Sequence, residues 1–439
     1  MISSSVPRLT SPSKPNKPPN NRKISADFRA KSTNLAELHP KTCIYQKKEV
    51  ILQAKLYDMK RFAVSNFGPI NDVNISFGDL TILVGPQASG KSISLELLKL
   101  AKDRDYIIHT LDKYNYIWGH NTENILNVYF GEGLSKLWKT ESMVSLDNVD
   151  FTLSQLPKKA SEKDEEVFYI PAQRILAMSE GRPRNFMEFD NSAPYVLRSF
   201  SETLRLFVQN GMGQANVVFP MKNRLKGFLR SSFNQSIFHD GKIVMEERGG
   251  QKKLLLNVDD MSVPFMAWSA GQKEFMPLLL AFYCLSGPPS KVVKREKYKT
   301  VIIEEPEMGL HPKAIISIIL QVLELMQSGY QVVLSTHSSV LLEFAWAFNI
   351  LKNINPKVQY KALNELFGVK EDSSVSAMLA GVFDKSIRTY YFNREIAKGK
   401  VNSFDISTLD AGASNSDIAD WGGISGFATH VSDVIARYI

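Results

Sequence analysis

Apolar and polar residues follow different periods along the chain, and each period predicts a different kind of element. Residues 61–85 (RFAVSNFGPINDVNISFGDLTILVG) alternate with a period near two and contain the turn pairs Gly68-Pro69 and Gly78-Asp79. This pattern predicts two or three short strands joined by turns. The last of these strands, at 80–84, is almost wholly apolar, which favours a strand covered on both faces.

Helical periods then alternate with further short apolar stretches. A helix is predicted from Ser92, and a β-meander is predicted at 237–266. Other strands are predicted at 167–170, 301–303 and 331–334, and other helices at 194–232, after 271 and at 314–327. Alternating buried strands and helices predict an α/β fold with a largely parallel sheet covered by helices.

The two ends of the chain have less regular patterns. Residues 388–392 and 403–406 are candidates for a pair of strands, and residues 424–437 for a final helix. Residues 1–50 are rich in Ser, Pro, Lys and Asn and hold ten Lys or Arg against three Asp or Glu, which predicts a disordered basic tail. This tail is either a solvated leader or a weak electrostatic arm for nucleic acid or an acidic partner.

Composition excludes several classes of protein. The 439 residues, 44% of them hydrophobic, suffice for two or three lobes with a real core. The two cysteines, Cys43 and Cys284, are too few for a disulfide framework, which fits a reducing cytoplasm. Because the apolar runs are too short for a membrane span and the N-terminus is polar, we expect a soluble cytoplasmic protein without a membrane partner.

A glycine-rich motif follows the strand at 80–84 and precedes the predicted helix. It satisfies the P-loop pattern GxxxxGK[ST], in which backbone N–H groups and a helix N-terminus surround the phosphates of a nucleotide. Lys91 is expected to reach the β- and γ-phosphates of ATP, and the hydroxyl of Ser92 to bind Mg²⁺. The predicted nucleotide-binding residues are Gly85, Pro86, Gln87, Ala88, Ser89, Gly90, Lys91 and Ser92.

Two glutamates follow the apolar strand at 301–303, in the sequence VIIEEP. A carboxylate at such a strand end is the Walker B arrangement of P-loop ATPases. Glu304 is expected to face Mg²⁺ together with Ser92. Glu305 is expected to orient and polarise the water that attacks ATP, while Lys91 supports the same step at the γ-phosphate.

The sequence Trp268-Ser269-Ala270-Gly271-Gln272 lies between these two motifs, just before a predicted helix. In this context it resembles the ABC-type ATPases, whose signature is approximately LSGGQ. Ser269, Gly271 and Gln272 match the signature, whereas Trp268 and Ala270 depart from it. The resemblance implies that Ser269 and Gly271 bind a γ-phosphate held by an opposite subunit.

Further segments match the motif order of the same family. Residues 307–312 stand where the D-loop is found, and His337 has the position of the switch histidine that senses the γ-phosphate. Gln173, in the loop PAQR, matches the Q-loop glutamine, which contacts the nucleotide and Mg²⁺. The neighbouring Arg174 is an alternative phosphate contact.

The opening at 65–92 and the EEPExxLHP form of the D-loop resemble the SMC, RecF and OLD branch of the family rather than membrane transporters. This branch implies an ATPase head with an N-terminal antiparallel β subdomain and a helical insertion. No heptads are visible, so coiled-coil arms are not expected. The expected parts are a tail (1–50), the first half of the ATPase core (51–160), the Q-loop, helical insertion and meander (161–265), the second half of the core (266–350) and a C-terminal extension (351–439).

The segment after His337 lacks the acidic pattern of a Toprim nuclease domain, so the chain most resembles stand-alone ATPase subunits of prokaryotic anti-phage systems such as PARIS. The resemblance implies a homodimer or higher homo-oligomer that binds ATP between subunits and switches a separate effector protein. The alternative is a RecF-like repair ATPase acting on duplex DNA. Residues 51–439 hold 43 basic and 42 acidic residues, and this neutral balance counts against direct DNA binding.

Overall fold

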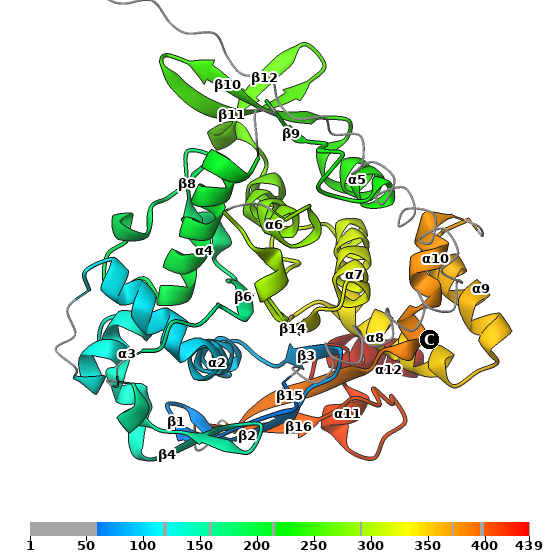
Figure 1. The fold of residues 1–439 in the computed structure, drawn as a ribbon. Helices are drawn as coiled ribbons and strands as arrows, with labels where there is room; N and C mark the ends of the chain where they lie inside the picture. The colour runs from blue at the N-terminus through cyan, green and yellow to red at the C-terminus, as the bar shows by residue number, and fades with distance from the viewer. Residues whose placement is uncertain are drawn as a thin grey trace, which may run out of the picture. The chain divides into compact units, whose positions relative to one another are not determined.

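The computed structural model describes residues 59–438 except 117–120, 157, 159, 213–215, 290–291, 371–372 and 396–398. The predicted basic tail and Cys43 lie outside the described residues. Residues 57–439 form one compact unit (Figure 1). None of the described helices has both the length and the apolar character needed to cross a membrane.

A ten-stranded sheet runs through this unit, and half of it is parallel. Four of the parallel strands are short and buried on both faces, as their largely apolar sequences predict, whereas the fifth, Ile387–Glu395, is longer and partly exposed. In spatial order the parallel strands are β15 (Ile387–Glu395), β3 (Leu80–Val84), β14 (Gln331–Ser335), β13 (Thr300–Glu304) and β6 (Val167–Ile170). The predicted parallel core is therefore confirmed.

The other half of the sheet is largely antiparallel and contains the predicted N-terminal β subdomain. Its strands are β5 (Val149–Phe151), β4 (Trp138–Leu146), β1 (Arg61–Phe67), β2 (Ile70–Ser76) and β16 (Lys400–Asp405). The predicted pair near the C-terminus is confirmed, because β15 and β16 are antiparallel neighbours.

The C-terminal strands are not a separate extension, which corrects the boundary predicted at 351. β15 pairs with the P-loop strand β3, and β16 pairs with β2, so the last part of the chain joins the two halves of the sheet. In Figure 1 the orange β15 and β16 accordingly lie beside the blue strands. This pairing was not predictable locally, because the partners are more than 300 residues apart in the sequence.

Helices cover both faces of the sheet, and alternate residues of the parallel strands point to each side. On one side Ile82 and Leu334 pack with α6, α7 and α8, and on the other Leu83 and Val333 pack with α2 and α3. The helices are α2 (Lys91–Lys113), α3 (Thr122–Phe130), α4 (Tyr195–Leu206), α5 (Gly227–Phe233), α6 (Ala270–Ser286), α7 (Pro312–Gln327), α8 (Ser339–Lys352), α9 (Pro356–Leu366), α10 (Ser374–Ala380), α11 (Ser416–Ala419) and α12 (Gly426–Tyr438).

The helical insertion and three strands of the meander are present where the sequence predicts them, whereas the fourth strand, at 217–219, lies inside the range 194–232 that was predicted to be helical. Gly249 and Gly250 both have positive φ angles, 62° and 73°, and form the hairpin turn between two strands of the meander. The meander continues directly into α6 (Figure 1). Its strands are β9 (Val217–Phe219), β10 (Lys242–Arg248), β11 (Gln251–Val258) and β12 (Met261–Pro264), and a small hairpin, β7 (Met178–Ser179) and β8 (Arg182–Pro183), lies earlier in the chain.

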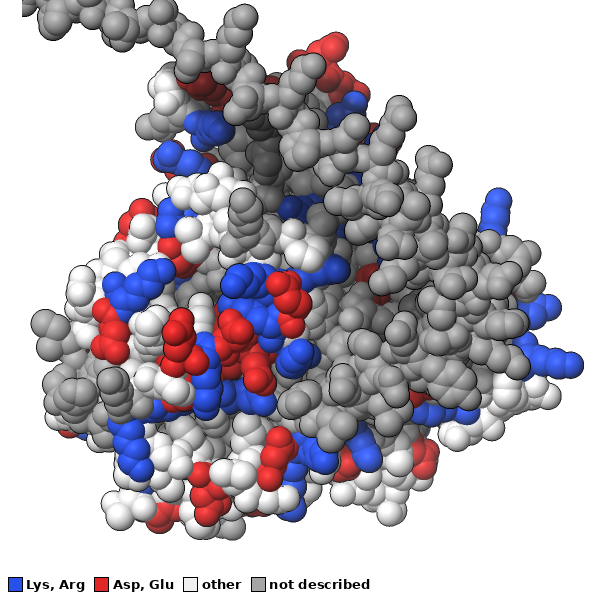
Figure 2. All heavy atoms as spheres, viewed as in Figure 1, with Lys and Arg blue, Asp and Glu red and all other residues white. Residues whose placement is uncertain are grey.

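Charged side chains of both signs lie interspersed on the described part of the face shown in Figure 2. The neutral balance of the sequence is thus visible on this face as a mixture of cations and anions. No broad basic stripe is seen among the described side chains of this view.

Candidate nucleotide-binding site

The sequence motifs meet at one edge of the sheet, because parallel strands end on the same side. In the parallel register Glu304 lies opposite Ser335, and Ser335 lies opposite Leu83. The loops that follow β3, β13 and β14 therefore lie next to one another. A cavity of about 330 Å³ at this edge is lined by Pro69, Gln87, Ala88, Ser89, Gly90, Lys91, Ser92, Ile93, Glu305 and His337.

Lys91 points back into the P-loop. Its ammonium donates hydrogen bonds to the carbonyl oxygens of Gly85 at 2.8 Å and Pro86 at 2.9 Å, and lies 3.3 Å from the hydroxyl of Ser89. Burial lowers the pKa of Lys91 to about 8, and the carboxylate of Glu305 opposes that shift. The cation therefore sits in the loop that the motif assigns to the phosphates.

The loop backbone has the conformation of a phosphate cradle. Ala88 and Gly90 have positive φ angles of 55° and 81°, which turns successive N–H groups inward. Gly85 is required for another reason: a Cβ there would lie 2.6 Å from the carbonyl oxygen of Phe392 in β15. Arg394 of the same strand donates to the carbonyl oxygen of Ala88 at 3.3 Å. The C-terminal strand thus braces the P-loop, a contact that the sequence analysis missed.

Glu304 is buried, with 3% of its surface exposed, at the end of β13. Burial raises the pKa of this carboxyl group, whereas hydrogen bonds from Ser92 and Tyr169 oppose the shift. The phenol of Tyr169 donates to Glu304 Oε1 at 2.6 Å. A buried carboxylate beside a serine hydroxyl is an oxygen donor set that suits Mg²⁺, so the residues present fit the predicted ion. When bound, that ion would neutralise charge on the phosphates.

Glu305 lies next to His337, the predicted switch histidine. Its Oε1 is 3.5 Å from Nε2 of His337, and the hydrogen bond from His337 holds the pKa of Glu305 below its usual range. The backbone of Glu305 has a φ of 41°, and its N–H donates to the carbonyl oxygen of Ser335 at 2.9 Å. An ionised carboxylate facing the cavity is able to accept a proton from a water molecule, as its predicted role requires.

Glu307 joins the D-loop to the histidine loop and was not singled out in the sequence analysis. Its Oε1 accepts hydrogen bonds from the backbone N–H of His337 at 2.6 Å and from the hydroxyl of Thr336 at 2.7 Å. Thr336 is fully buried. Glu307 therefore positions the segment that carries His337, and its place as the third glutamate of the EEPE sequence was the only available signal.

Arg174 is a second residue whose role the sequence analysis missed, and the predicted phosphate contact is wrong for it. The side chain is fully buried. Its guanidinium donates to the carbonyl oxygens of Glu304, Glu305 and Pro306 at 3.1 to 3.5 Å, and Nε donates to that of Glu274 in α6 at 3.2 Å. The cation is thus occupied in joining the Walker B end to the signature helix.

The signature segment begins α6. Ser269 is the N-cap: its hydroxyl accepts from the N–H of Gln272 at 3.3 Å, while the side chain of Gln272 accepts from the N–H of Ser269 at 3.2 Å. Trp268 is buried and its indole donates to Val263, which explains why a large residue replaces the usual leucine. A Cβ on Gly271 would lie 2.6 Å from the carbonyl oxygen of Gly309, so the helix start packs tightly on the D-loop.

Ser269, Gly271 and Gln272 do not line the P-loop cavity in the described part of the chain. Ser269 is exposed to solvent. Gln173 is also exposed, three residues beyond the end of β6, and it does not line the cavity either. Its predicted contact with nucleotide and Mg²⁺ stays a prediction.

Comparison with known proteins finds one matching family model and several similar proteins. Residues 151–343, just under half of the chain, match a family described as "AAA domain, putative AbiEii toxin, Type IV TA system". These residues include the signature, both Walker B glutamates and His337. This match supports a P-loop ATPase domain of the AAA kind in the chain. The P-loop upstream of the matched region completes this ATPase.

The ATPase is also similar to the Old nuclease of Escherichia phage P2, with 36% identity over 100 residues. The match covers 22% of this chain but only 17% of that nuclease. Solved structures with a similar fold include an SMC head bound to the C-terminal winged helix domain of ScpA (11% identity, 79% of this chain and 97% of that chain, TM-score 0.37) and the SMC head domain of Thermotoga maritima (11%, 79% and 98%, TM-score 0.34).

Replacement of Arg174 by lysine tests the buried contact. A single ammonium is unable to hold carbonyl groups from several loops, so we expect ATP turnover to fall at least about tenfold and the free energy of unfolding to fall by about 2–4 kcal/mol. ATP affinity should change little, because Lys91 and the P-loop are untouched.

Turnover, equilibrium ATP binding and urea unfolding measure these three effects. The matched control is Arg230→Lys, because Arg230 also donates to carbonyl groups but lies outside the site. Unchanged turnover in Arg174→Lys would show that the buried guanidinium does not organise the catalytic edge.

Proposed function

We propose that this ATPase binds ATP between two copies of the chain and uses closure and hydrolysis to switch a partner protein. The observation that carries the proposal is the separation of two sets of residues. The P-loop cavity is lined by Lys91, Glu305 and His337, while the exposed Ser269 lies outside it. A second copy is able to bring its Ser269 to the open side of the cavity.

The start of α6 suits a phosphate from a second copy. Ser269 is exposed, and its capping bond occupies only the N–H of Gln272. The N–H groups of Ala270 and Gly271 precede the first helical hydrogen bond, which Lys273 makes to Ser269. Free N–H groups at the positive end of a helix bind anions, and ATP would supply that anion.

Within one chain, the D-loop connects the start of α6 to His337. Gly271 packs on Gly309 of the D-loop, and Glu307 of the same loop accepts a hydrogen bond from the N–H of His337 at 2.6 Å. Contact between Ser269 and the partner's nucleotide would therefore act on the site that holds the chain's own nucleotide. A ligand that binds the closed pair more tightly than the open one shifts the equilibrium toward closure, which is what a switch requires.

A role in anti-phage defence is the finer part of this proposal. It is supported by the similarity to a nuclease from a phage and by the toxin–antitoxin description of the matching family. Because the match covers a small part of that nuclease, the destructive activity is assigned to a separate effector. The chain would contribute the nucleotide-dependent switch.

Mixing two inactive variants tests the shared site. Ser269→Arg should block closure, and Lys91→Ala should lose the cation beside the phosphates. A heterodimer of the two keeps one intact site, so an equal mixture should recover about a quarter of the wild-type turnover in a symmetric dimer. Phosphate release measures the rescue.

The matched control mixes Lys91→Ala with the double variant Lys91→Ala/Ser269→Arg. In this mixture neither protein has an intact P-loop, so no dimer contains an intact site. If the first mixture shows no more turnover than this control at any mixing ratio, the result would favour a site that is complete within one chain.

A plating assay tests the defence role. Bacteria that carry the gene with its chromosomal neighbours should plate at least one of a panel of phages less efficiently than bacteria carrying Lys91→Ala, because the switch requires ATP. Equal plating of every phage on the two strains would contradict the defence role without affecting the shared ATP site.

A further inference from the structure

A cavity of about 640 Å³ lies apart from the P-loop, between the β7–β8 hairpin, the end of α4 and the meander. Four of its lining residues are cationic and one is acidic. Its volume falls within the range of about 300–1,000 Å³ that small-molecule sites occupy. The charged residues that line it are Arg182, Arg184, Arg205, Lys252 and Glu188.

Among the described residues, three of the four cations form no ion pair, although Asp190 lies within electrostatic range of Arg184. In the described part of the chain, no ion pair joins Arg182, Arg184 or Lys252 to a carboxylate. Glu247 stands opposite Lys252 in the hairpin register without forming an ion pair. Arg182 and Lys252 line the cavity and are exposed to solvent. The cavity therefore favours an anion.

Two of the arginines are held in place before any ligand arrives. The guanidinium of Arg184 stacks on the ring of Phe189, 4.0 Å from its centroid, and donates to the carbonyl oxygen of Glu188. Arg205 makes a two-pronged contact with Glu202 at 2.6 and 2.8 Å and donates to Gln209 at 2.7 Å. Fixed guanidinium groups lose little entropy on binding, which favours recognition of an oxyanion.

The remaining wall is half apolar and half polar. Val208, Met212, Met245 and Pro183 are its apolar members, and Ser179, Asn185, Gln209 and Asn216 are its polar members. Methionine side chains adapt to flat ligands, and apolar and neutral polar groups beside fixed cations suit a molecule with a base-like end and an anionic end. We propose that this cavity is a second ligand site, separate from the ATP site, for a phosphorylated nucleoside of mononucleotide size.

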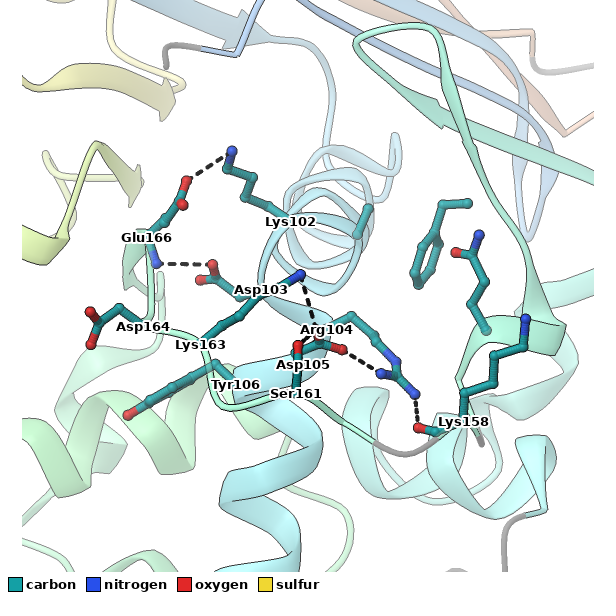
Figure 3. Close-up of a pocket in the computed structure, with 13 residues that line it drawn as sticks. Lys102, Asp103, Arg104, Asp105, Tyr106, Lys158, Ser161, Lys163, Asp164 and Glu166 are labelled. Carbon is teal, nitrogen blue, oxygen red and sulfur yellow. Dashed lines mark hydrogen bonds and ion pairs between the residues drawn. The ribbon is translucent and has the colours of Figure 1, made fainter. Parts of the chain in front are cut away.

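A second cavity of similar size shows that an excess of cations is not a general property of cavities on this surface. It has a volume of about 580 Å³ and lies along α2 (Figure 3). There three of the four lining cations are paired: Lys102 with Glu166 at 2.9 Å, Lys163 with Asp105 at 3.0 Å, and Arg104 also with Asp105. This charge-compensated cavity has no excess cation to attract a phosphate, and it provides a matched control.

The proposed site is connected to the catalytic edge through one short segment. Arg174 holds the Walker B carbonyl groups, and the N–H of Arg184, ten residues later, donates to the carbonyl oxygen of Ala177 at 2.9 Å. Gly181 lies between these two arginines in the sequence. A Cβ on Gly181 would lie 3.0 Å from Phe265, and Phe265 precedes Ser269 by four residues. A ligand on Arg182 and Arg184 is therefore placed to alter ATP turnover.

Binding of the four 5′-mononucleotides, AMP, GMP, CMP and UMP, to the full chain tests the site. The measurement is made by calorimetry in the Lys91→Ala background, so that the P-loop does not contribute. At least one mononucleotide should bind with saturation. Adding Arg182→Ala and Lys252→Ala should weaken that binding at least about tenfold, because two unpaired cations are lost from the phosphate end.

The control adds Lys102→Ala and Lys163→Ala instead, which removes two cations from the compensated cavity and should leave the affinity unchanged. Circular dichroism verifies that each variant is folded. The absence of saturable binding for all four mononucleotides, or an equal loss in the two double variants, would overturn the proposal.

Competition identifies the source of the ligand. A 5′-phosphorylated trinucleotide that displaces the bound mononucleotide would identify the end of a nucleic acid as the source, and failure to displace it would identify a free nucleotide. In the wild-type chain the same mononucleotide should change ATP turnover at least about twofold, and it should have no effect in Arg182→Ala/Lys252→Ala. Unchanged wild-type turnover would overturn the coupling to the catalytic edge.

Discussion

The catalytic edge depends on the buried guanidinium of Arg174, which donates to carbonyl groups of three consecutive residues, Glu304 to Pro306, and to α6. Such carbonyl groups at strand ends have no partner in the sheet, and leaving them buried and unpaired would cost about 1–3 kcal/mol each. The planar guanidinium satisfies several of them at once. It thereby fixes the two Walker B glutamates relative to the helix that begins at Ser269.

The second constraint follows from the proposed pairing of two copies, in which one chain supplies each nucleotide site only in part. Lys91, Glu304, Glu305 and His337 gather at the ends of three parallel strands, whereas Ser269 is exposed elsewhere at the start of α6. Glu307 and the Gly271–Gly309 contact join these two regions within one chain. This continuity allows closure at one site to affect the other.

The sequence predicted those parts of the site that depend on local patterns. The P-loop, the Walker B glutamates and the histidine each follow an apolar strand directly, and parallel strands bring their ends together. The role of Arg174 was not predictable, because its acceptors at the Walker B end and in α6 lie 100 to 132 residues away in the sequence. The same holds for Phe392, which restricts Gly85 from a strand near the other end of the chain. Such contacts depend on tertiary packing, and no local pattern of apolar and polar residues predicts them.

The molar mass of Glu305→Gln with and without ATP and Mg²⁺ tests the shared site most directly. This variant should bind ATP but hydrolyse it slowly, so a closed pair should accumulate and the mass measured by light scattering should double. Glu305→Gln/Ser269→Arg should bind ATP without the change in mass. ATP binding by Glu305→Gln with no change in mass would contradict a site formed between two copies of the chain.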